Sequence, residues 1–156
     1  MTPTEFLKKY GDAFVVACEG TKLFPSVKLA QAALESSWGK YAAGNNLFGI
    51  KARGPKSPYW QGDYIESRTT EYQNGSYVPI TSRFRKYASI SDSIKDHNHF
   101  LKSNGIYANV FKAETPEEQA RALQNAGYAT GANYAKSLIS IINTYNLKRF
   151  DEKKNL

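Results

Sequence analysis

Gln31-Ala-Ala-Leu-Glu-Ser-Ser-Trp-Gly39 places a carboxylate in the last turns of a mostly apolar helix. Ser26 is a suitable N-cap for this helix, and Gly39 stands just past its expected end. The apolar stripe recurs at helical spacing, in Val27, Ala30, Leu34 and Trp38. Glu35 borders this stripe, with an indole and the negative end of the helix dipole nearby. These surroundings disfavour the ionised carboxylate, so we expect a raised pKa and a general acid; a solvated surface glutamate is the alternative.

The composition fits one domain with a packed core, spanning residues 1–156. The chain has a mass of 17.5 kDa and is 41% hydrophobic and 22% charged, which excludes a natively unfolded chain. Its one cysteine excludes an internal disulfide, and its two histidines do not supply a zinc cage. Because His97 and His99 do not share a helix face, we expect neither a metal site nor a cofactor.

The net charge of +7 favours an anionic partner, such as nucleic acid, a membrane surface or bacterial cell wall. No nucleic-acid recognition motif is present, so nucleic acid is not the expected partner. No apolar run approaches the roughly 20 residues that span a bilayer, so membrane insertion is not expected either. The N-terminal sequence lacks the apolar stretch of a secretion signal.

The pattern along the chain predicts helices, then a small sheet, then helices. Thr4 is a suitable cap for a first helix over about 5–19. Asn74-Gly75 favours a hairpin between strands 67–73 and 76–84, within an insertion of about 60–87. Further helices are expected from Ser89 or Ser91, over about 116–125 and over about 132–145. We therefore predict an α+β, two-lobed arrangement.

The segment that follows Glu35 and its helix suits a sugar-binding cleft, because Asn45, Asn46 and Phe48 supply amides and an aromatic ring. From here the sequence resembles glycoside hydrolase family 73, the bacterial cell-wall N-acetylglucosaminidases that include the flagellar peptidoglycan hydrolase domain and many autolysins. The matching blocks follow the family order: ALESSWGK (33–40), NNLFGIKA (45–52), TEY followed by NG (70–75), FRKYASISDSIKDHNHFL (84–101) and AGYATGANYAKSLISII (126–142).

The resemblance implies a lysozyme-like fold, in which a hairpin lobe borders the cleft of a mostly helical lobe. It assigns Glu35 as the catalytic acid and Glu71 as the second carboxylate, although strand alternation of uncertain register leaves Glu66 as a competitor. It also implies a cleft-facing tyrosine, either Tyr128 or Tyr134, with Tyr134 favoured as catalytic and Tyr128 as substrate-binding. Many relatives have Asp-Pro where this chain has Gly-Ala at 131–132, so the orientation of the tyrosine is open.

Aromatic side chains are candidates for stacking on pyranose rings, in Trp38, Phe48, Trp60 and Tyr72. Trp38 and Phe48 also suit core packing. Trp60 lies in a loop-like segment and is the strongest candidate for sugar contact.

The expected activity is that of an endo-β-N-acetylglucosaminidase, which cleaves peptidoglycan strands after N-acetylglucosamine. A lytic transglycosylase, a muramidase and an inactive wall-binding module are the alternatives. Carboxyls about 5–5.5 Å apart would favour retention, and about 6.5–9.5 Å inversion. A still longer separation would favour attack by the substrate's acetamido group.

The expected partner is the glycan strand, bound by a monomer acting on the periplasmic or extracellular cell wall. The sequence leaves open an inhibitor or immunity protein as a second partner. It equally leaves open delivery by a phage, by a secretion apparatus or by a fusion partner.

Overall fold

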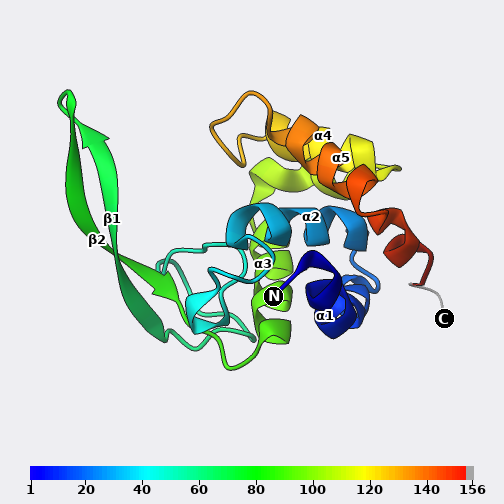
Figure 1. The fold of residues 1–156 in the computed structure, drawn as a ribbon, viewed down its shortest axis with the longest axis horizontal. Coiled ribbons are helices and arrows are strands. Elements are labelled where there is room, and N and C mark those ends of the chain that lie inside the picture. The colour runs from blue at the N-terminus through cyan, green and yellow to red at the C-terminus, as the bar shows by residue number, and fades with distance from the viewer. Residues whose placement is uncertain (154–156) are drawn as a thin grey trace.

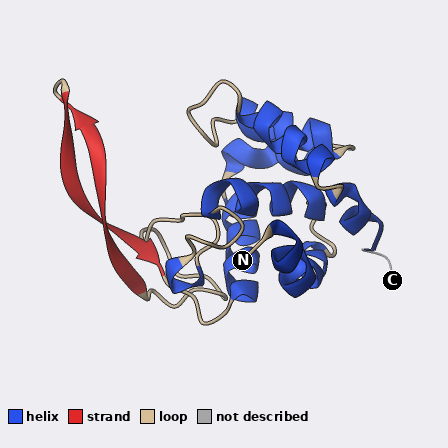
Figure 2. Ribbon diagram, in the orientation of Figure 1, coloured by secondary structure: helices blue, strands red, loops and turns tan. Residues whose placement is uncertain are grey.

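In the part of the chain that the structure describes, the five α-helices gather on one side and a long β-hairpin projects from the other (Figure 1, Figure 2). The computed structural model describes residues 1–153. Its α-helices are α1 (Pro3–Cys18), α2 (Pro25–Ser36), α3 (Ile90–Ser103), α4 (Pro116–Asn125) and α5 (Tyr134–Thr144). Three short 3₁₀ segments, η1 (Ala43–Asn45), η2 (Gly105–Lys112) and η3 (Leu147–Lys153), connect or follow them. The predicted order of helices, sheet and helices is confirmed.

Helix α2 runs through the middle of the helical lobe. Pro25 occupies its first turn, and every residue of 25–33 is buried. The prediction that Leu34 belongs to the buried stripe is wrong, because this side chain is 41% exposed where the helix leaves the core. The helix also ends earlier than predicted, since Ser37 and Trp38 adopt left-handed φ angles of 50° and 59°. The buried surface therefore surrounds α2 rather than following one stripe.

The ends of the other helices follow the capping chemistry at each site. Helix α1 is capped by Thr2 rather than Thr4, because Thr2 and Glu5 form a reciprocal capping box around Pro3. Helix α3 begins after Ser89, whose hydroxyl accepts a hydrogen bond from the amide of Asp92. Ser89 is one of the two residues at which this helix was predicted to start. Helix α4 has the predicted bounds, and α5 is shorter than the predicted 132–145.

Strands β1 (Tyr64–Gln73) and β2 (Ser76–Arg85) form the predicted antiparallel hairpin. Asn74 and Gly75 both have positive φ, 49° and 84°, as a type I′ turn requires. The paired region extends beyond the predicted strands to Tyr64 and Arg85. Lys51 forms a further bridge to Phe84, which joins the loop after η1 to the hairpin base.

The hairpin base is fastened to α3 through the buried carboxylate of Asp96. Arg85 donates to Asp96 over 2.8 Å, the hydroxyl of Ser57 donates over 2.5 Å, and the hydroxyl of Tyr87 donates to the same carboxylate. The expectation that Trp60 contacts sugar is corrected here. Its ring is 4% exposed beneath the Arg85 guanidinium, and its indole donates to the Asp63 carbonyl over 2.7 Å.

Within residues 1–153, no helix combines the length and apolar character needed to cross a membrane.

Candidate active site

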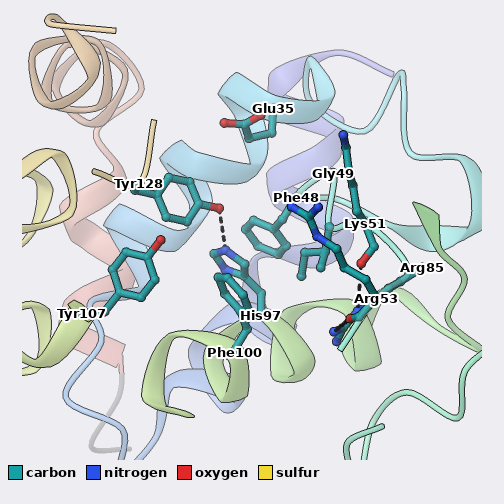
Figure 3. A pocket seen from close by; sticks show the side chains of 11 residues that line it. Glu35, Phe48, Gly49, Lys51, Arg53, Arg85, His97, Phe100, Tyr107 and Tyr128 are labelled. Carbon is teal, nitrogen blue, oxygen red and sulfur yellow. Dashed lines mark hydrogen bonds between the residues drawn. The ribbon is translucent and has the colours of Figure 1, made fainter. Parts of the chain in front are cut away.

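The Glu35 carboxyl lies at the boundary between two neighbouring pockets. One pocket, of about 360 Å³, lies between α2, α3 and the loop 48–53; Figure 3 shows its lining. The other, of about 650 Å³, is bounded by the turn 39–43 and by Ile65, Ser67 and Thr69 of β1. Glu35 and Gly49 line both pockets. Together the pockets make a groove that passes the carboxyl, with the helical lobe on one side and the hairpin on the other.

The groove walls shape the acidity of Glu35. Burial raises the pKa of this carboxyl, as a general acid requires. The expected indole neighbour is not the cause, because Trp38 packs against Phe6 and Tyr145 at ring-centre distances of 5.7 and 4.7 Å. Glu35 as a residue remains exposed, so partial desolvation of its carboxyl, and not an indole contact, raises its pKa.

The two candidate tyrosines occupy successive layers behind the groove. Tyr128 lines the first pocket, and its hydroxyl lies 2.6 Å from Nε2 of His97 (Figure 3). Tyr134 stacks behind it at a ring distance of 5.5 Å and is only 6% exposed; its hydroxyl accepts from Gln31 over 3.1 Å. Burial raises the pKa of both phenols, and the Glu35 charge adds to this effect. Tyr128 is thus the tyrosine at the groove surface.

The two candidate asparagines shape the loop that forms the groove floor. Asn45 donates to the Tyr87 carbonyl over 3.0 Å. The Asn46 side chain donates to the carbonyls of Ile50 and Arg85 and accepts from two loop amides. Their polar atoms hold the protein backbone, so their main contribution is the shape of the loop.

The hairpin carboxylates lie on opposite faces of β1. Glu71 shares the face of Ser67 and Thr69, which line the second pocket, and lies beyond them toward the hairpin tip. Its carboxylate is 3.8 Å from the Lys51 ammonium, and Lys51 also lines the Glu35 pocket. Glu66 faces the other way and pairs with Arg83 at 3.5 Å. Lys51 therefore connects the hairpin to the groove.

The two remaining aromatic candidates differ in position. Phe48 is 4% exposed, lines the first pocket and stacks on His97 at 4.0 Å, so it both packs and borders the groove. Tyr72 is 65% exposed near the hairpin tip, where its ring meets Tyr77 edge-on at 5.2 Å. A contact of Tyr72 with substrate would therefore lie at the outer end of the groove.

The cationic side of the groove and the buried residues behind it were not predicted from the sequence. Lys51, Arg53 and Arg85 line the pocket that contains Glu35. Lys28 is fully buried on α2 and contacts His97. One signal was available: positions 28, 31 and 35 share one helix face, which is polar within an otherwise apolar helix.

Among residues 1–153, no three His, Cys, Asp or Glu side chains gather as metal ligands would. Both ring nitrogens of His97 already have protein partners, Lys28 and Tyr128.

The comparisons with known proteins point to one family. Residues 11–147 match the glucosaminidase family, described as mannosyl-glycoprotein endo-beta-N-acetylglucosaminidase. The peptidoglycan hydrolase FlgJ of Salmonella typhimurium is 43% identical over 132 residues, or 80% of this chain and 40% of FlgJ. A probable N-acetylmuramidase of Lactococcus lactis subsp. lactis is 35% identical over 94% of this chain and 34% of its own length. This chain thus spans less than half of either relative.

The fold is also shared with a solved structure. The catalytic domain of the autolysin Auto from Listeria monocytogenes superposes with a TM-score of 0.82 and 31% identity. The match covers 96% of this chain and 87% of that domain. The expected fold, a mostly helical lobe with one hairpin, is confirmed.

Proposed function

This chain belongs to the glucosaminidase family of glycoside hydrolases, and we propose that it is an endo-β-N-acetylglucosaminidase of peptidoglycan with Glu35 as its general acid. The observation that carries this proposal is the position of Glu35. Its carboxyl borders both halves of the groove, and burial raises its pKa. A protonated carboxyl here suits donation to a glycosidic oxygen lying across the two pockets.

The charge of the groove supports peptidoglycan over a neutral glycan. Lys51 and Arg53 line the Glu35 pocket beside Arg85, whose own charge is balanced by Asp96. A muramyl residue carries a lactyl carboxylate or, where that group is amide-linked to a stem peptide, the carboxylates of the peptide; these cations attract either, whereas chitin strands carry none. Peptidoglycan is also the substrate named for the Salmonella relative.

The Lys51 and Arg53 side chains provide a test of this preference. Changing both to Met should lower kcat/KM on peptide-bearing glycan strands and leave kcat/KM on N-acetylglucosamine oligomers little changed. Equal losses on both substrates would contradict a role in recognising substrate charge.

In the reaction that we propose, Glu35 protonates the leaving oxygen while negative charge stabilises the anomeric carbon from the opposite face. Glu71 is the proposed source of that charge, or of the base that activates water, because it occupies the groove-facing side of the hairpin. Its ion pair with Lys51 is solvent-exposed and weak, about 0–1 kcal/mol, so substrate can replace it. If Glu71 stays remote, the acetamido group of the substrate becomes the nucleophile, and the Tyr128 hydroxyl is placed to orient it.

The bond that is cleaved can be identified from the products. The family description names an N-acetylglucosaminidase, whereas the Lactococcus relative is named a probable muramidase. Mass spectrometry of digested walls should find reducing N-acetylglucosamine ends. Reducing muramic acid ends would indicate a muramidase, and anhydromuramyl ends a lytic transglycosylase.

The role of Glu35 is tested by Glu35→Gln, which keeps the size of the side chain and removes the transferable proton. We expect this variant to bind purified walls like the parent and to lose hydrolysis. Wall digestion at the parental rate would exclude Glu35 as the acid. A parent that binds without cleaving would indicate a wall-binding module.

The cellular setting of this activity follows the same proposal. The substrate requires action at the bacterial cell wall, and a monomer that binds one strand is sufficient for it. An inhibitor or immunity protein that covers the groove is a further proposed partner.

A further inference from the structure

A lysine is buried in the core directly beneath the groove. The Lys28 side chain is 0% exposed, although lysine is among the residues least often buried. Its ammonium nitrogen contacts Nδ1 of His97 and lies 4.4 Å from the centre of the Phe48 ring. Neither partner is a carboxylate. Burial accordingly lowers the pKa of Lys28 well below its usual value.

Lys28 is the inner end of a chain of contacts that reaches the groove. His97 is also fully buried, and its ring is stacked against Phe48 at 4.0 Å with planes 3° apart. The Phe100 ring also stacks on the His97 ring, with 6.2 Å between the ring centres. The stacking fixes the ring plane, so Nδ1 is held toward Lys28 and Nε2 toward the Tyr128 hydroxyl at 2.6 Å. Tyr128 in turn lines the pocket that contains Glu35 (Figure 3).

Packing alone does not explain this lysine. Burying an amine without a carboxylate partner costs stability, and the Cys18 thiol, whose charge would raise the Lys28 pKa, does not outweigh the effect of burial. A methionine of similar length would fill the same space without that cost. Burying Lys28 and His97 therefore lowers stability, which a purely structural core would avoid. We take this as an indication that the two residues serve the groove.

The order of hydrogen bonds gives the chain a direction. The Lys28 nitrogen contacts Nδ1 of His97, and we take it as the donor because it carries hydrogens in either protonation state. Burial, with the Lys28 charge, lowers the pKa of His97, which favours the neutral ring with one proton. When Nδ1 accepts, that proton resides on Nε2 and is donated to the Tyr128 oxygen. The phenol hydrogen of Tyr128 is then free to point elsewhere.

We propose that Lys28 and His97 are positioning residues that fix the Tyr128 hydroxyl as a hydrogen-bond donor to the saccharide in the groove. The acceptor would be an oxygen of the substrate, of which the acetamido carbonyl is the strongest acceptor on an N-acetylated sugar. Their role presupposes the glycoside hydrolase activity proposed above. The tautomer of His97, however, is a property of the protein without substrate and can be measured independently.

The first test is the tautomer of His97, read from ¹⁵N chemical shifts in protein labelled at histidine. Only two histidines are present, and His99→Gln removes the signal of the exposed one without touching the groove. We expect a neutral ring protonated at Nε2 throughout pH 5–8. A ring protonated at Nδ1, or an imidazolium, would overturn the proposal. In Lys28→Met we expect the Nδ1-protonated form to appear, with Nε2 accepting from Tyr128.

The second test separates function from stability in Lys28→Met. We expect a thermal midpoint equal to or above that of the parent. We also expect kcat/KM to fall about ten-fold, because the Tyr128 hydroxyl would no longer donate its hydrogen bond to the substrate. Full activity in this variant would refute the proposal. Lost stability with full activity per folded molecule would assign Lys28 to the core alone.

A double-mutant cycle tests whether the effect passes through the phenol. Tyr128→Phe should lower kcat/KM by a similar factor, and adding Lys28→Met to it should cause no further loss. Additive losses would contradict the proposal. His97→Gln, which retains a donor toward Tyr128, should keep more activity than His97→Phe, which retains only the stacking. If the parent cleaves no wall polymer, the proposed function fails, while the histidine tautomer still decides the hydrogen-bond order.

Discussion

Glu71 and Glu66 lie on opposite faces of β1, because an odd number of positions separates them along an unbroken strand. Only the Glu71 face continues into the groove, through Ser67 and Thr69. We predict that Glu71→Gln lowers kcat on purified walls by about 10²-fold or more, the usual scale for a lost acid or base. The release of reducing ends measures this.

Glu66→Gln is the matched control, since it changes the same side chain on the other face of the same strand. It breaks only an exposed ion pair with Arg83 and should leave kcat within about two-fold of the parent. Similar losses in both variants would mean that the hairpin acts through its stability rather than through the Glu71 carboxylate.

The features predicted well from sequence are those that depend on neighbouring residues. Asn74-Gly75 supplies the positive φ angles of the hairpin turn, so local chemistry is sufficient to place it. Thr115 caps α4 directly before Pro116, which determines where that helix begins. Glu35 belongs to the same class, because its place near the end of α2 is set by the helix period.

The features that the sequence did not reveal depend on distant contacts. Trp60 lies in a segment whose sequence predicts a loop, and the Arg85 guanidinium from the hairpin lies over its ring. Lys28 and His97 are 69 residues apart, so neither periodicity nor spacing connects them. Leu34 fits the apolar period, yet α2 opens to solvent at that point. Such residues are placed by tertiary packing, which a local pattern does not describe.

The raised pKa of Glu35 predicts that the general acid costs the protein stability. The folded state holds this proton to a higher pH than the unfolded chain, whose carboxyl titrates near 4.5. Stability therefore falls as the pH rises from about that value through the folded pKa. Glu35→Gln removes this loss, so urea unfolding at pH 7 should give a higher free energy of unfolding than the parent. The difference should vanish below about pH 4.

Glu117→Gln should show the opposite sign. Its hydrogen bond with Lys148 lowers the pKa of the Glu117 carboxyl, so the folded state gains stability above the unfolded pKa. The variant should therefore be slightly less stable than the parent at pH 7 and equal to it in acid. A Glu35→Gln protein that is destabilised at pH 7 would argue against a raised pKa.

The Asp96 carboxylate is predicted to be the most costly side chain to neutralise at the hairpin base. It is fully buried and accepts hydrogen bonds from Arg85, Ser57 and Tyr87. In Asp96→Asn one acceptor becomes a donor, and the Arg85 charge remains buried without its counter-ion. We expect a loss of about 3–5 kcal/mol in the free energy of unfolding, measured with urea.

The exposed ion pair between Arg83 and Glu66 provides the comparison for this loss. Both of its side chains are more than half exposed, so Glu66→Gln should cost less than about 1 kcal/mol. A similarly small loss in Asp96→Asn would show that water replaces the buried network without penalty.

Gly49 combines a positive φ of 66° with a position on both halves of the groove, beside Glu35. A Cβ at this position would meet no atom within 4 Å, so a methyl group would stand in the open groove where we propose that the glycan binds. We predict that Gly49→Ala loses about 1–2 kcal/mol of stability from the left-handed backbone and also raises KM for wall fragments.

Gly20→Ala separates the two effects, because Gly20 has a similar φ of 71°, equally open space and no part in the groove. It should lose comparable stability and keep the parental KM. A KM that rises equally in both variants would mean that backbone strain, and not the methyl group in the groove, weakens substrate binding.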